Sequence, residues 1–440
     1  MKYGFVVVEN QHEEERDFYT IRTFLINTND EEDAEKRKVK QFHFTGWPDM
    51  QAPEFAGPVL RLLDEVNEYN PSDVGPIVAH CSAGVGRTGT FITIDSMLKM
   101  AKAEGKLDIF NFVSQMRSRR VFMVQTEPQY EFIHDAILEA LFCNDTTIAN
   151  ADMERTWAHV NRDRAWLSDQ HGALEAMFPP VSVERCTGGR NPENVTKNRY
   201  PDRIPPDSSR PYLMSISDSG GTNYINATFC NGYSKDNMYL ATQAPLPNTV
   251  NDFWCMIYDY KCRTIVALND PKKQDKTCGH YCPDEGTLTC GAFTIEATSM
   301  KRIDNVVKRK LKLYKGNNKE EVVNVTQIQY TDWSGKLERP KSSDSFQQLL
   351  RHVEEGRRES GDQRMAIMCM DGVTRCGLLS ALISILDQIK EEQQVDVFQA
   401  VKRLRKARYD MVHSLAQYKF CYEMARVYLQ GFEEYANFTP

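Results

Sequence analysis

The 440-residue sequence has no run of eighteen or more apolar residues, so it predicts no membrane-spanning helix. Its first residues, MKYGFVVVENQHEEERD, have a short apolar stretch followed at once by acidic residues, which excludes a usable secretory signal peptide. Basic residues do not dominate, with 54 lysines and arginines against 61 acidic residues. Without a basic patch, nucleic acid is not expected as a partner.

A disulfide framework is also missing. The 12 cysteines are scattered without regular spacing, which favours a reducing compartment such as the cytoplasm. The stretch Cys278–Cys282 (CGHYC), with Cys290 nearby, has an atypical spacing for zinc and lacks a fourth ligand. We therefore expect neither a metal nor another cofactor.

The stretch that organises the chain is HCSAGVGRTG, His80–Gly89. It follows an apolar run at Ile77–Ala79, predicted as a strand, and precedes an amphipathic run at Thr90–Met100, predicted as a helix. A glycine-rich loop in this position turns backbone N–H groups inward, and the helix N-terminus adds partial positive charge. We call His80–Gly89 the signature loop and predict that it binds an anion.

The side chains of this loop indicate a nucleophile directed at phosphorus. A thiol at Cys81 should have its pKa pulled well below the free value of about 8.5, and a thiolate beside a bound phosphate is a nucleophile. Arg87 offers a planar pair of donors for two phosphate oxygens. Thr88 can donate its hydroxyl to the sulfur, and His80 can orient the cysteine. The remaining phosphate-facing positions are Ser82, Ala83, Gly84, Val85 and Gly86.

HCSAGVGRTG resembles the signature loop of the protein tyrosine phosphatases, and the longer VAHCSAGVGRTGTF resembles their phosphotyrosine-specific branch. Trp47-Pro48-Asp49 resembles the family's acid loop, and its distance ahead of Cys81 fits the spacing of the two motifs in that family. The resemblance makes Asp49 the general acid, on a loop that closes over the substrate and protonates the leaving oxygen. Gln125 and Gln129 match the glutamines that position the hydrolytic water.

The sequence repeats itself at a nearly constant offset. Trp47 is repeated as Trp333, Cys81 is repeated as Cys369, and VQTEPQYEF is repeated as VHSLAQYKF. We therefore predict an α/β chain with two tandem phosphatase-like units, each by resemblance a twisted mixed sheet flanked by helices. We place the first unit at 1–143, a polar linker at 144–168 and the second unit at 169–437.

The two units differ in what precedes the repeat. Only the second unit carries KNRY, which ends at Tyr200 and resembles the family's phosphotyrosine-recognition loop, and YINA after it. We therefore expect the first unit to lack its N-terminal part. On this interpretation a membrane association would come only from a missing N-terminal transmembrane region.

The second unit has lost much of the chemistry. Its loop reads IMCMDGVTRCG, Ile367–Gly377, which keeps Cys369 and Arg375 but has Asp371 in place of Ala83. A carboxylate there opposes a phosphate dianion, at a cost of about 4 kcal/mol per unit of like charge at about 4 Å and an effective dielectric constant near 20. Alternatively, Asp371 pairs with Arg375. Further positions are also changed: Gly335 replaces Asp49, Cys376 replaces Thr88, and His413 replaces Gln125, whereas Gln417 repeats Gln129.

Tandem units, the first intact and the second degraded, resemble the cytoplasmic part of receptor-type protein tyrosine phosphatases. The ending FEEYANF resembles the alpha/epsilon-like group. The resemblance implies hydrolysis of phosphotyrosine on proteins through a phosphocysteine, a regulatory second unit, and a location at the cytoplasmic face of the plasma membrane. Inter-domain or homodimer contacts would fit. One alternative is an inactive phosphatase-like binding fragment; a dual-specificity or lipid phosphatase is disfavoured by KNRY.

Overall fold

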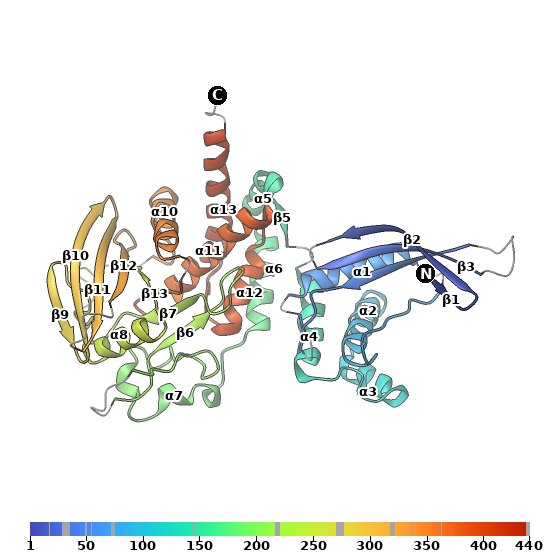
Figure 1. The fold of residues 1–440 in the computed structure, drawn as a ribbon, viewed down its shortest axis with the longest axis horizontal. Helices are drawn as coiled ribbons and strands as arrows, with labels where there is room; N and C mark the ends of the chain where they lie inside the picture. Colours follow the sequence, from blue (N-terminus) through green and yellow to red (C-terminus); the bar gives the residue numbers. More distant parts are fainter. Residues whose placement is uncertain are drawn as a thin grey trace. The chain divides into compact units, whose positions relative to one another are not determined.

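The computed structural model describes residues 1–16, 18–28, 36–48, 51–53, 55–71, 75–143, 146–215, 221–269, 277–316, 322–335, 337–361 and 363–436. The chain divides into two units, Met1–Asp145 and Thr146–Pro440, and each has its own hydrophobic core (Figure 1).

The described strands of the first unit form an antiparallel sheet in the order β1-β2-β3-β4. Helices α1, α2 and α4 share a core built around Leu63, Ile94 and Ile133. The strands are β1 (Lys2–Tyr3), β2 (Val6–Glu15), β3 (Tyr19–Thr28) and β4 (Arg37–Phe44). The helices are α1 (Gly57–Tyr69), α2 (Gly86–Glu104), α3 (Ile109–Arg119) and α4 (Glu127–Phe142).

Local chemistry explains where these helices begin and end. Asp108 caps α3 by accepting a hydrogen bond from the Asn111 N–H at 3.1 Å. Gly105 ends α2 in the left-handed conformation, with φ of 67°. At the start of α4, the Gln129 side chain accepts a hydrogen bond from the Thr126 N–H at 3.4 Å. These signals set the end of α2 and the starts of α3 and α4, the helices that follow the signature loop and surround the glutamine stretch.

The second unit contains an eight-stranded mixed sheet in the order β6-β7-β13-β8-β12-β11-β10-β9 (Figure 1). Strand β13 is parallel to both its neighbours, β7 and β8. The strands are β6 (Ala227–Cys230), β7 (Tyr239–Gln243), β8 (Thr264–Ala267), β9 (Gly286–Cys290), β10 (Phe293–Ile303), β11 (Val306–Lys315), β12 (Val323–Tyr330) and β13 (Met365–Cys369). The longer helices are α8 (Val250–Asp259), α10 (Ser343–Glu359), α11 (Thr374–Glu392), α12 (Val397–Ala407) and α13 (Leu415–Ala436), and the short ones are α7 (Thr187–Arg190), η2 (Val183–Arg185), η3 (Val195–Lys197) and η4 (Pro247–Thr249).

The linker predicted at 144–168 is wrong for residues 146–168, which are part of the second unit. They contain β5 (Ile148–Ala149), η1 (Asn150–Asp152), α5 (Met153–Arg162) and the start of α6 (Arg164–Met177), and β5 pairs with β14 (Gln394–Val395). The polar composition concealed helices with one apolar face. Met153, Val160 and Leu167 are buried, and the Trp166 ring lies 5.7 Å from the Tyr422 ring. Residues 144 and 145 lie outside the described residues.

The internal repeat is confirmed in structural detail. Helices α11, α12 and α13 begin at the positions that repeat the starts of α2, α3 and α4, all at the same offset as Cys369 from Cys81. The β2–β3 pair has a bulge between Asn10 and His12, and the β10–β11 pair has one between Ala297 and Ser299. The bulge is thus repeated at almost the same offset. The predicted fold class, an α/β chain with tandem phosphatase-like units, is confirmed.

The strand predicted at Ile77–Ala79 does not form. Residues 75–81 have no strand assignment, and the Val78 side chain is 85% exposed. The counterpart of Val78 in the second unit is Ala366, which lies in β13 and is fully buried. Strand β13 is hydrogen-bonded on both edges, whereas no described strand of the first unit pairs with residues 75–81. An apolar run forms a strand only where neighbouring strands take up its backbone groups.

Candidate active site

The signature loop leads into the N-terminus of α2, as the sequence predicted. Gly84 has φ of 67°, a conformation that disfavours other residues, and its N–H donates to Cys81 Sγ at 3.2 Å. Cys81 is half-buried at the start of this turn. Helix α2 begins at Gly86, so its first N–H groups lie next to the sulfur. The loop therefore collects donors around one nucleophilic atom.

These donors change the protonation of Cys81. Burial by itself would raise the pKa of the thiol. The Thr88 hydroxyl and the backbone N–H groups of Thr88, Val85 and Gly84 outweigh burial and lower the pKa to about 7. A free cysteine has a pKa of about 8.5. At neutral pH a large fraction of Cys81 is thus the nucleophilic thiolate.

The pH dependence of Cys81 alkylation tests this environment. Because the folded pKa is depressed, the thiolate is present above pH 7 and is lost as the pH falls through 7. Iodoacetamide labelling, quantified for each cysteine by peptide mass spectrometry, should be half-maximal near pH 7 at Cys81. Thr88→Ala removes one donor and should move the midpoint upward. The fully buried Cys369 is the internal control and should label far more slowly. A Cys81 midpoint at about 8.5 would contradict the assignment.

The glutamine stretch meets the loop at Gly86. A Cβ added at Gly86 would lie 2.9 Å from Gln129 Oε1 and 3.3 Å from Gln125 Oε1. Gln129 is buried, and its Oε1 accepts from the Gln125 N–H at 3.0 Å. Gln125 is exposed at the surface of the site. This arrangement gives Gln129 a role in building the loop, and it leaves Gln125 as the glutamine accessible to a water.

The acid loop is anchored on both sides of its proposed acid. Trp47 packs edge-on between Phe44 and Phe132, with ring centroids 6.0 and 5.9 Å away. Its Nε1 donates to the Gln51 carbonyl at 2.9 Å, and the same carbonyl accepts from Gln129 Nε2 at 3.4 Å. Asp49 itself lies outside the described residues. The described flanks show that the acid loop is tied to the glutamine stretch.

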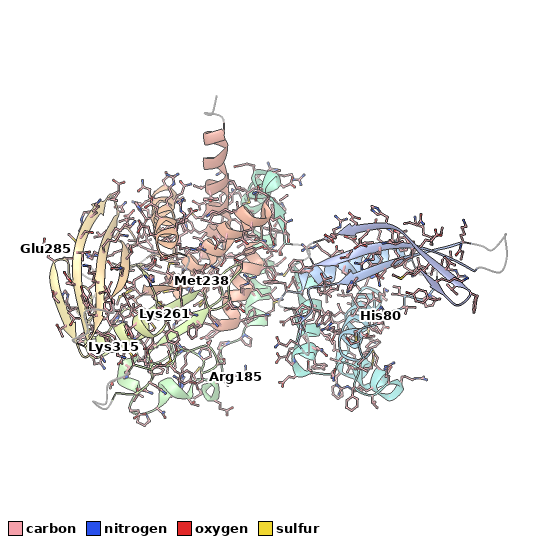
Figure 2. The ribbon with its side chains drawn as sticks, in the orientation of Figure 1. His80, Arg185, Met238, Lys261, Glu285 and Lys315 are labelled. Carbon is pink, nitrogen blue, oxygen red and sulfur yellow. The ribbon has the colours of Figure 1, made fainter. Side chains whose placement is uncertain are left out.

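The other predicted site residues lie along the signature loop and the first turn of α2. His80, labelled in Figure 2, is exposed immediately before Cys81. Arg87 is half-buried in the first turn of α2, and Thr88 is buried beside the sulfur. The other predicted phosphate-facing positions surround the turn: Ser82 and Ala83 are exposed, Gly84 and Val85 are half-buried, and Gly86 is buried.

Sequence reasoning missed two arginines that support the loop. Arg120 Nη2 donates to the Ala83 carbonyl at 2.8 Å. Arg117 donates to the carbonyls of Met123 and Val124, at 2.9 and 2.6 Å. Both arginines recur at the offset of the repeat, as Arg405 and Arg408. Comparing the two units at that offset would have found them.

The second-unit loop holds its cysteine differently. Cys369 is fully buried at the end of β13, and its Sγ lies 3.1 Å from Asp371 Oδ1. Cys376, which replaces Thr88, has its Sγ 3.2 Å from Cys369 Sγ. Burial raises the pKa of Cys376, and the neighbouring Cys369 adds to that rise. A thiol that resists ionisation thus occupies the position where the first unit has the Thr88 hydroxyl donor.

The predicted pairing of Asp371 with Arg375 is not found. Arg375 Nη1 donates to the carbonyls of Leu268 and Trp333, at 2.7 and 3.2 Å, and Nη2 donates to the Ser334 carbonyl at 3.1 Å. Its guanidinium also lies 4.8 Å from the centre of the Trp333 ring. Arg375 is therefore engaged by the acid-loop segment.

The remaining predicted positions of the second site are also described. Gly335 lies in a turn after Ser334 and offers no side chain. Tyr200 is 38% exposed at the end of KNRY. The preceding Arg199 donates its N–H to Gln243 Oε1 at 3.0 Å, and a Cβ added at Gly372 would lie 2.5 Å from the Gln243 nitrogen. The KNRY stretch thus lies beside the second-unit loop.

Comparison with known proteins agrees with this geometry. The family profile described as protein-tyrosine phosphatase matches residues 1–139 and 194–426, covering both units. The chain is 38% identical over 423 residues to receptor-type tyrosine-protein phosphatase U of Gallus gallus, covering 94% of this chain and 29% of the relative. It is 38% identical over 434 residues to receptor-type tyrosine-protein phosphatase epsilon of Mus musculus and of Homo sapiens, covering 96% of this chain and 61% of each relative.

The resemblance to receptor-type protein tyrosine phosphatases that the sequence predicted is thereby confirmed. The chain spans less than two thirds of the length of these relatives. Among the described helices, none has the length and apolar character needed to cross a membrane.

Proposed function

We propose, from the premise that this chain belongs to the protein-tyrosine phosphatase family, that its first unit hydrolyses phosphotyrosine on proteins. The observation that carries the proposal is the environment of Cys81, whose donors lower the pKa of the thiol to about 7. A nucleophile ionised at neutral pH beside inward-facing amides suits attack on a phosphate ester.

In the first step, the Cys81 thiolate attacks phosphorus and forms an S–P bond. The P–O bond to the phenol breaks, and Asp49 supplies the proton that the leaving oxygen needs. Arg87 and the loop N–H groups stabilise the equatorial oxygens, where negative charge accumulates. The products are the substrate protein with a dephosphorylated tyrosine side chain, and a phosphocysteine at Cys81.

In the second step, a water placed by Gln125 attacks the phosphocysteine. Asp49, now a carboxylate, takes a proton from that water, and the S–P bond breaks. The Thr88 hydroxyl stabilises Cys81 as it leaves as a thiolate. Gln129 acts by positioning Gln125 and the Gly86 turn, because its side chain is buried and hydrogen-bonded. Inorganic phosphate is released and the enzyme is regenerated.

For the second unit we propose a regulatory pseudophosphatase role. It has no carboxylate at Gly335 and no hydroxyl at Cys376, and its Arg375 donates to the acid-loop carbonyls of Trp333 and Ser334. General acid catalysis alone contributes about 10²- to 10⁴-fold in rate. We place the substrates, phosphotyrosine proteins, at the cytoplasmic face of the plasma membrane, in keeping with receptor-type relatives.

Trapping the covalent intermediate tests the proposal. The chain is mixed with a ³²P-phosphotyrosine peptide, quenched in acid within milliseconds, digested and mapped. We expect label on the peptide that contains Cys81 and none on the peptide that contains Cys369. A phosphoserine peptide is the matched substrate control and should give no label. Label at Cys369, or phosphate release without label on Cys81, would contradict the mechanism.

The alternative function, a phosphatase-like binding fragment, has a specific observation behind it. Residues 75–81 of the first unit lack strand partners, and no described residue of that unit corresponds to KNRY. Phosphopeptide binding without label or phosphate release, in a chain whose Cys81 still alkylates with a midpoint near pH 7, would favour this alternative.

A further inference from the structure

We infer that the second-unit loop is an oxyanion-binding site that the chain keeps filled with its own Asp371 carboxylate. The inference deepens the proposed role of the second unit as a non-hydrolysing domain. Only the functional meaning of the filled loop rests on that proposal. The contacts of Asp371 do not depend on hydrolysis by the first unit.

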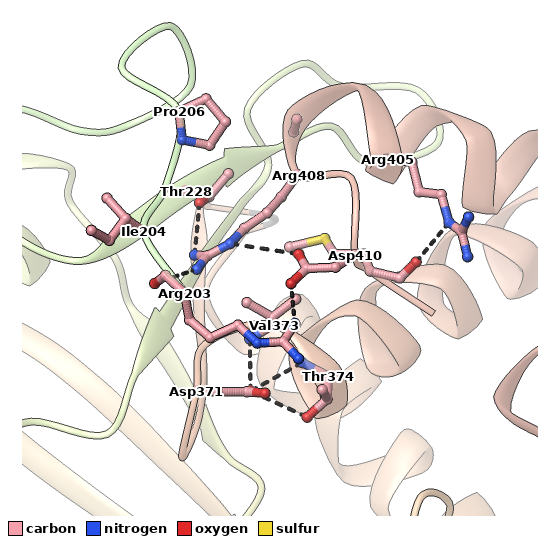
Figure 3. A network of polar contacts seen from close by, with 12 residues as sticks. Arg203, Ile204, Pro206, Thr228, Asp371, Val373, Thr374, Arg405, Arg408 and Asp410 are labelled. Atoms are coloured by element: carbon pink, nitrogen blue, oxygen red, sulfur yellow. Dashed lines mark hydrogen bonds and ion pairs between the residues drawn. The ribbon is translucent and has the colours of Figure 1, made fainter. Parts of the chain in front are cut away.

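The hydrogen bonds of Asp371 are those expected of a bound anion. Its Oδ1 accepts from the Val373 N–H and the Thr374 N–H, both at 3.0 Å, and from the Thr374 hydroxyl at 3.1 Å. The Cys369 thiol donates to the same oxygen at 3.1 Å. Figure 3 shows the Asp371 carboxylate facing Val373 and Thr374. Four donors thus converge on one carboxylate oxygen.

One of these donors has another target in the first unit. Val85, the counterpart of Val373, directs its N–H to the Cys81 sulfur and helps to lower its pKa. Position 83 is alanine there, so no side-chain anion competes. In the second unit the carboxylate takes the amide that would otherwise serve the sulfur. The presence of Asp371 at the position equivalent to Ala83 therefore both fills the loop and removes a donor from the nucleophile.

Two arginines complete this arrangement. Burial alone would lower the pKa of Arg203, but the charges of Asp410 first, and then Asp371, raise it, so Arg203 faces the filled loop with opposite charge (Figure 3). Arg375 is engaged by the carbonyls of Leu268, Trp333 and Ser334. The amides of Val373 and Thr374, the Cys369 thiol and Arg375 thus all have partners within the chain. An incoming phosphate would meet the half-buried carboxylate of Asp371 and an occupied guanidinium.

Burial of the carboxylate is the cost that this arrangement overcomes. Burial would raise the pKa of Asp371, but the hydrogen bonds from Val373, Cys369 and Thr374 outweigh it and lower the pKa. The carboxylate is therefore an anion at neutral pH. A loop that stabilises one buried anion this well should accept another of suitable shape once Asp371 is removed.

Hydrogen–deuterium exchange on the full chain tests the inference, read on peptides covering residues 368–378 with tungstate as the tetrahedral oxyanion probe. In Asp371→Ala we expect the amides of Val373 and Thr374 to exchange at least about tenfold faster than in the wild type, since charge-assisted hydrogen bonds are lost. Tungstate, compared with chloride at equal ionic strength, should restore protection in the variant and leave the wild type unchanged. Asp236→Ala removes an exposed carboxylate elsewhere in the second unit and should behave as wild type.

Three outcomes would overturn the inference: unchanged exchange in Asp371→Ala, tungstate protection of the wild-type loop, or no tungstate protection in the variant. Should Asp371→Ala unfold the second unit, Asp371→Ser replaces it, because serine removes the charge and is small enough to leave room for the probe. Tungstate must then protect the Ser loop and not the wild-type loop. Since every readout is a second-unit peptide, failure of phosphotyrosine hydrolysis in the first unit would leave these results intact.

Discussion

A Cys81→Ser variant is expected to hydrolyse phosphotyrosine peptides about 10⁴-fold more slowly than the wild-type chain, or slower still. The serine hydroxyl does not ionise near neutral pH, so the donors that lower the pKa of Cys81 to about 7 have no thiolate to stabilise. The variant changes one atom in a loop that is otherwise intact. The measurement is the initial rate of phosphate release at pH 7.

The repeat supplies a matched control for this variant. Cys369→Ser makes the same change at the equivalent position of the second unit, in a loop filled by Asp371. Its rate should stay within about twofold of wild type, the range expected when a residue takes no part in the transition state. A Cys81→Ser variant that keeps a tenth of the wild-type rate would remove Cys81 from the nucleophile role. A large loss in Cys369→Ser would assign chemistry to the second unit.

Asp49→Ala is expected to lower turnover of phosphotyrosine peptides by about 10²- to 10⁴-fold, the usual contribution of a general acid. Trp47 and Gln129 both bond to the Gln51 carbonyl, so the ends of the acid loop stay anchored without the carboxylate. Substrate binding should therefore survive. The measurements are the turnover rate and the dissociation constant of a phosphotyrosine peptide.

The leaving group separates an acid from a merely structural residue. A phenol of high pKa needs a proton as the P–O bond breaks, whereas a dinitrophenol leaves as a stable anion. Asp49→Ala should thus lose most of its rate with phenyl phosphate and little with dinitrophenyl phosphate. Equal losses with both esters would indicate damage to the loop, and an unchanged rate with phenyl phosphate would show that Asp49 is not the acid.

Local signals in the sequence predicted much of the fold. The helix predicted over Thr90–Met100 lies within α2, which begins at Gly86 and ends where Gly105 adopts the left-handed conformation. The last helices of the second unit follow from those of the first because the repeat keeps a fixed offset through them. Such features depend on neighbours in sequence, and a single chain reveals them.

The errors arose where partners distant in sequence decide the outcome. Ile77–Ala79 has the composition of a strand. Its counterpart β13 is a strand because β7 and β8 pair with it on both edges, and no described strand of the first unit does the same for residues 77–79. Residues 146–168 have a linker composition, yet Trp166 packs against Tyr422 from the last helix. For Asp371, charge arithmetic identified the conflict with phosphate and suggested Arg375 as the partner. The backbone N–H groups of Val373 and Thr374, which follow Asp371 in the loop, were the closer donors.

The turn before the last helix has the same strained backbone in both units, which allows the two sites to be compared. Val124 and Val412 both have positive φ, 59° and 52°, which costs a β-branched residue of the order of 1–3 kcal/mol. Arg117 and Arg405 hold the carbonyls of those turns in the same way. Strain of this kind is commonly taken as a mark of catalysis, but here it survives in a unit whose acid and hydroxyl are gone. A feature that both units share despite their different site residues belongs to the scaffold, so comparing the two units separates the common architecture from the positions that differ, such as Thr88 and Cys376.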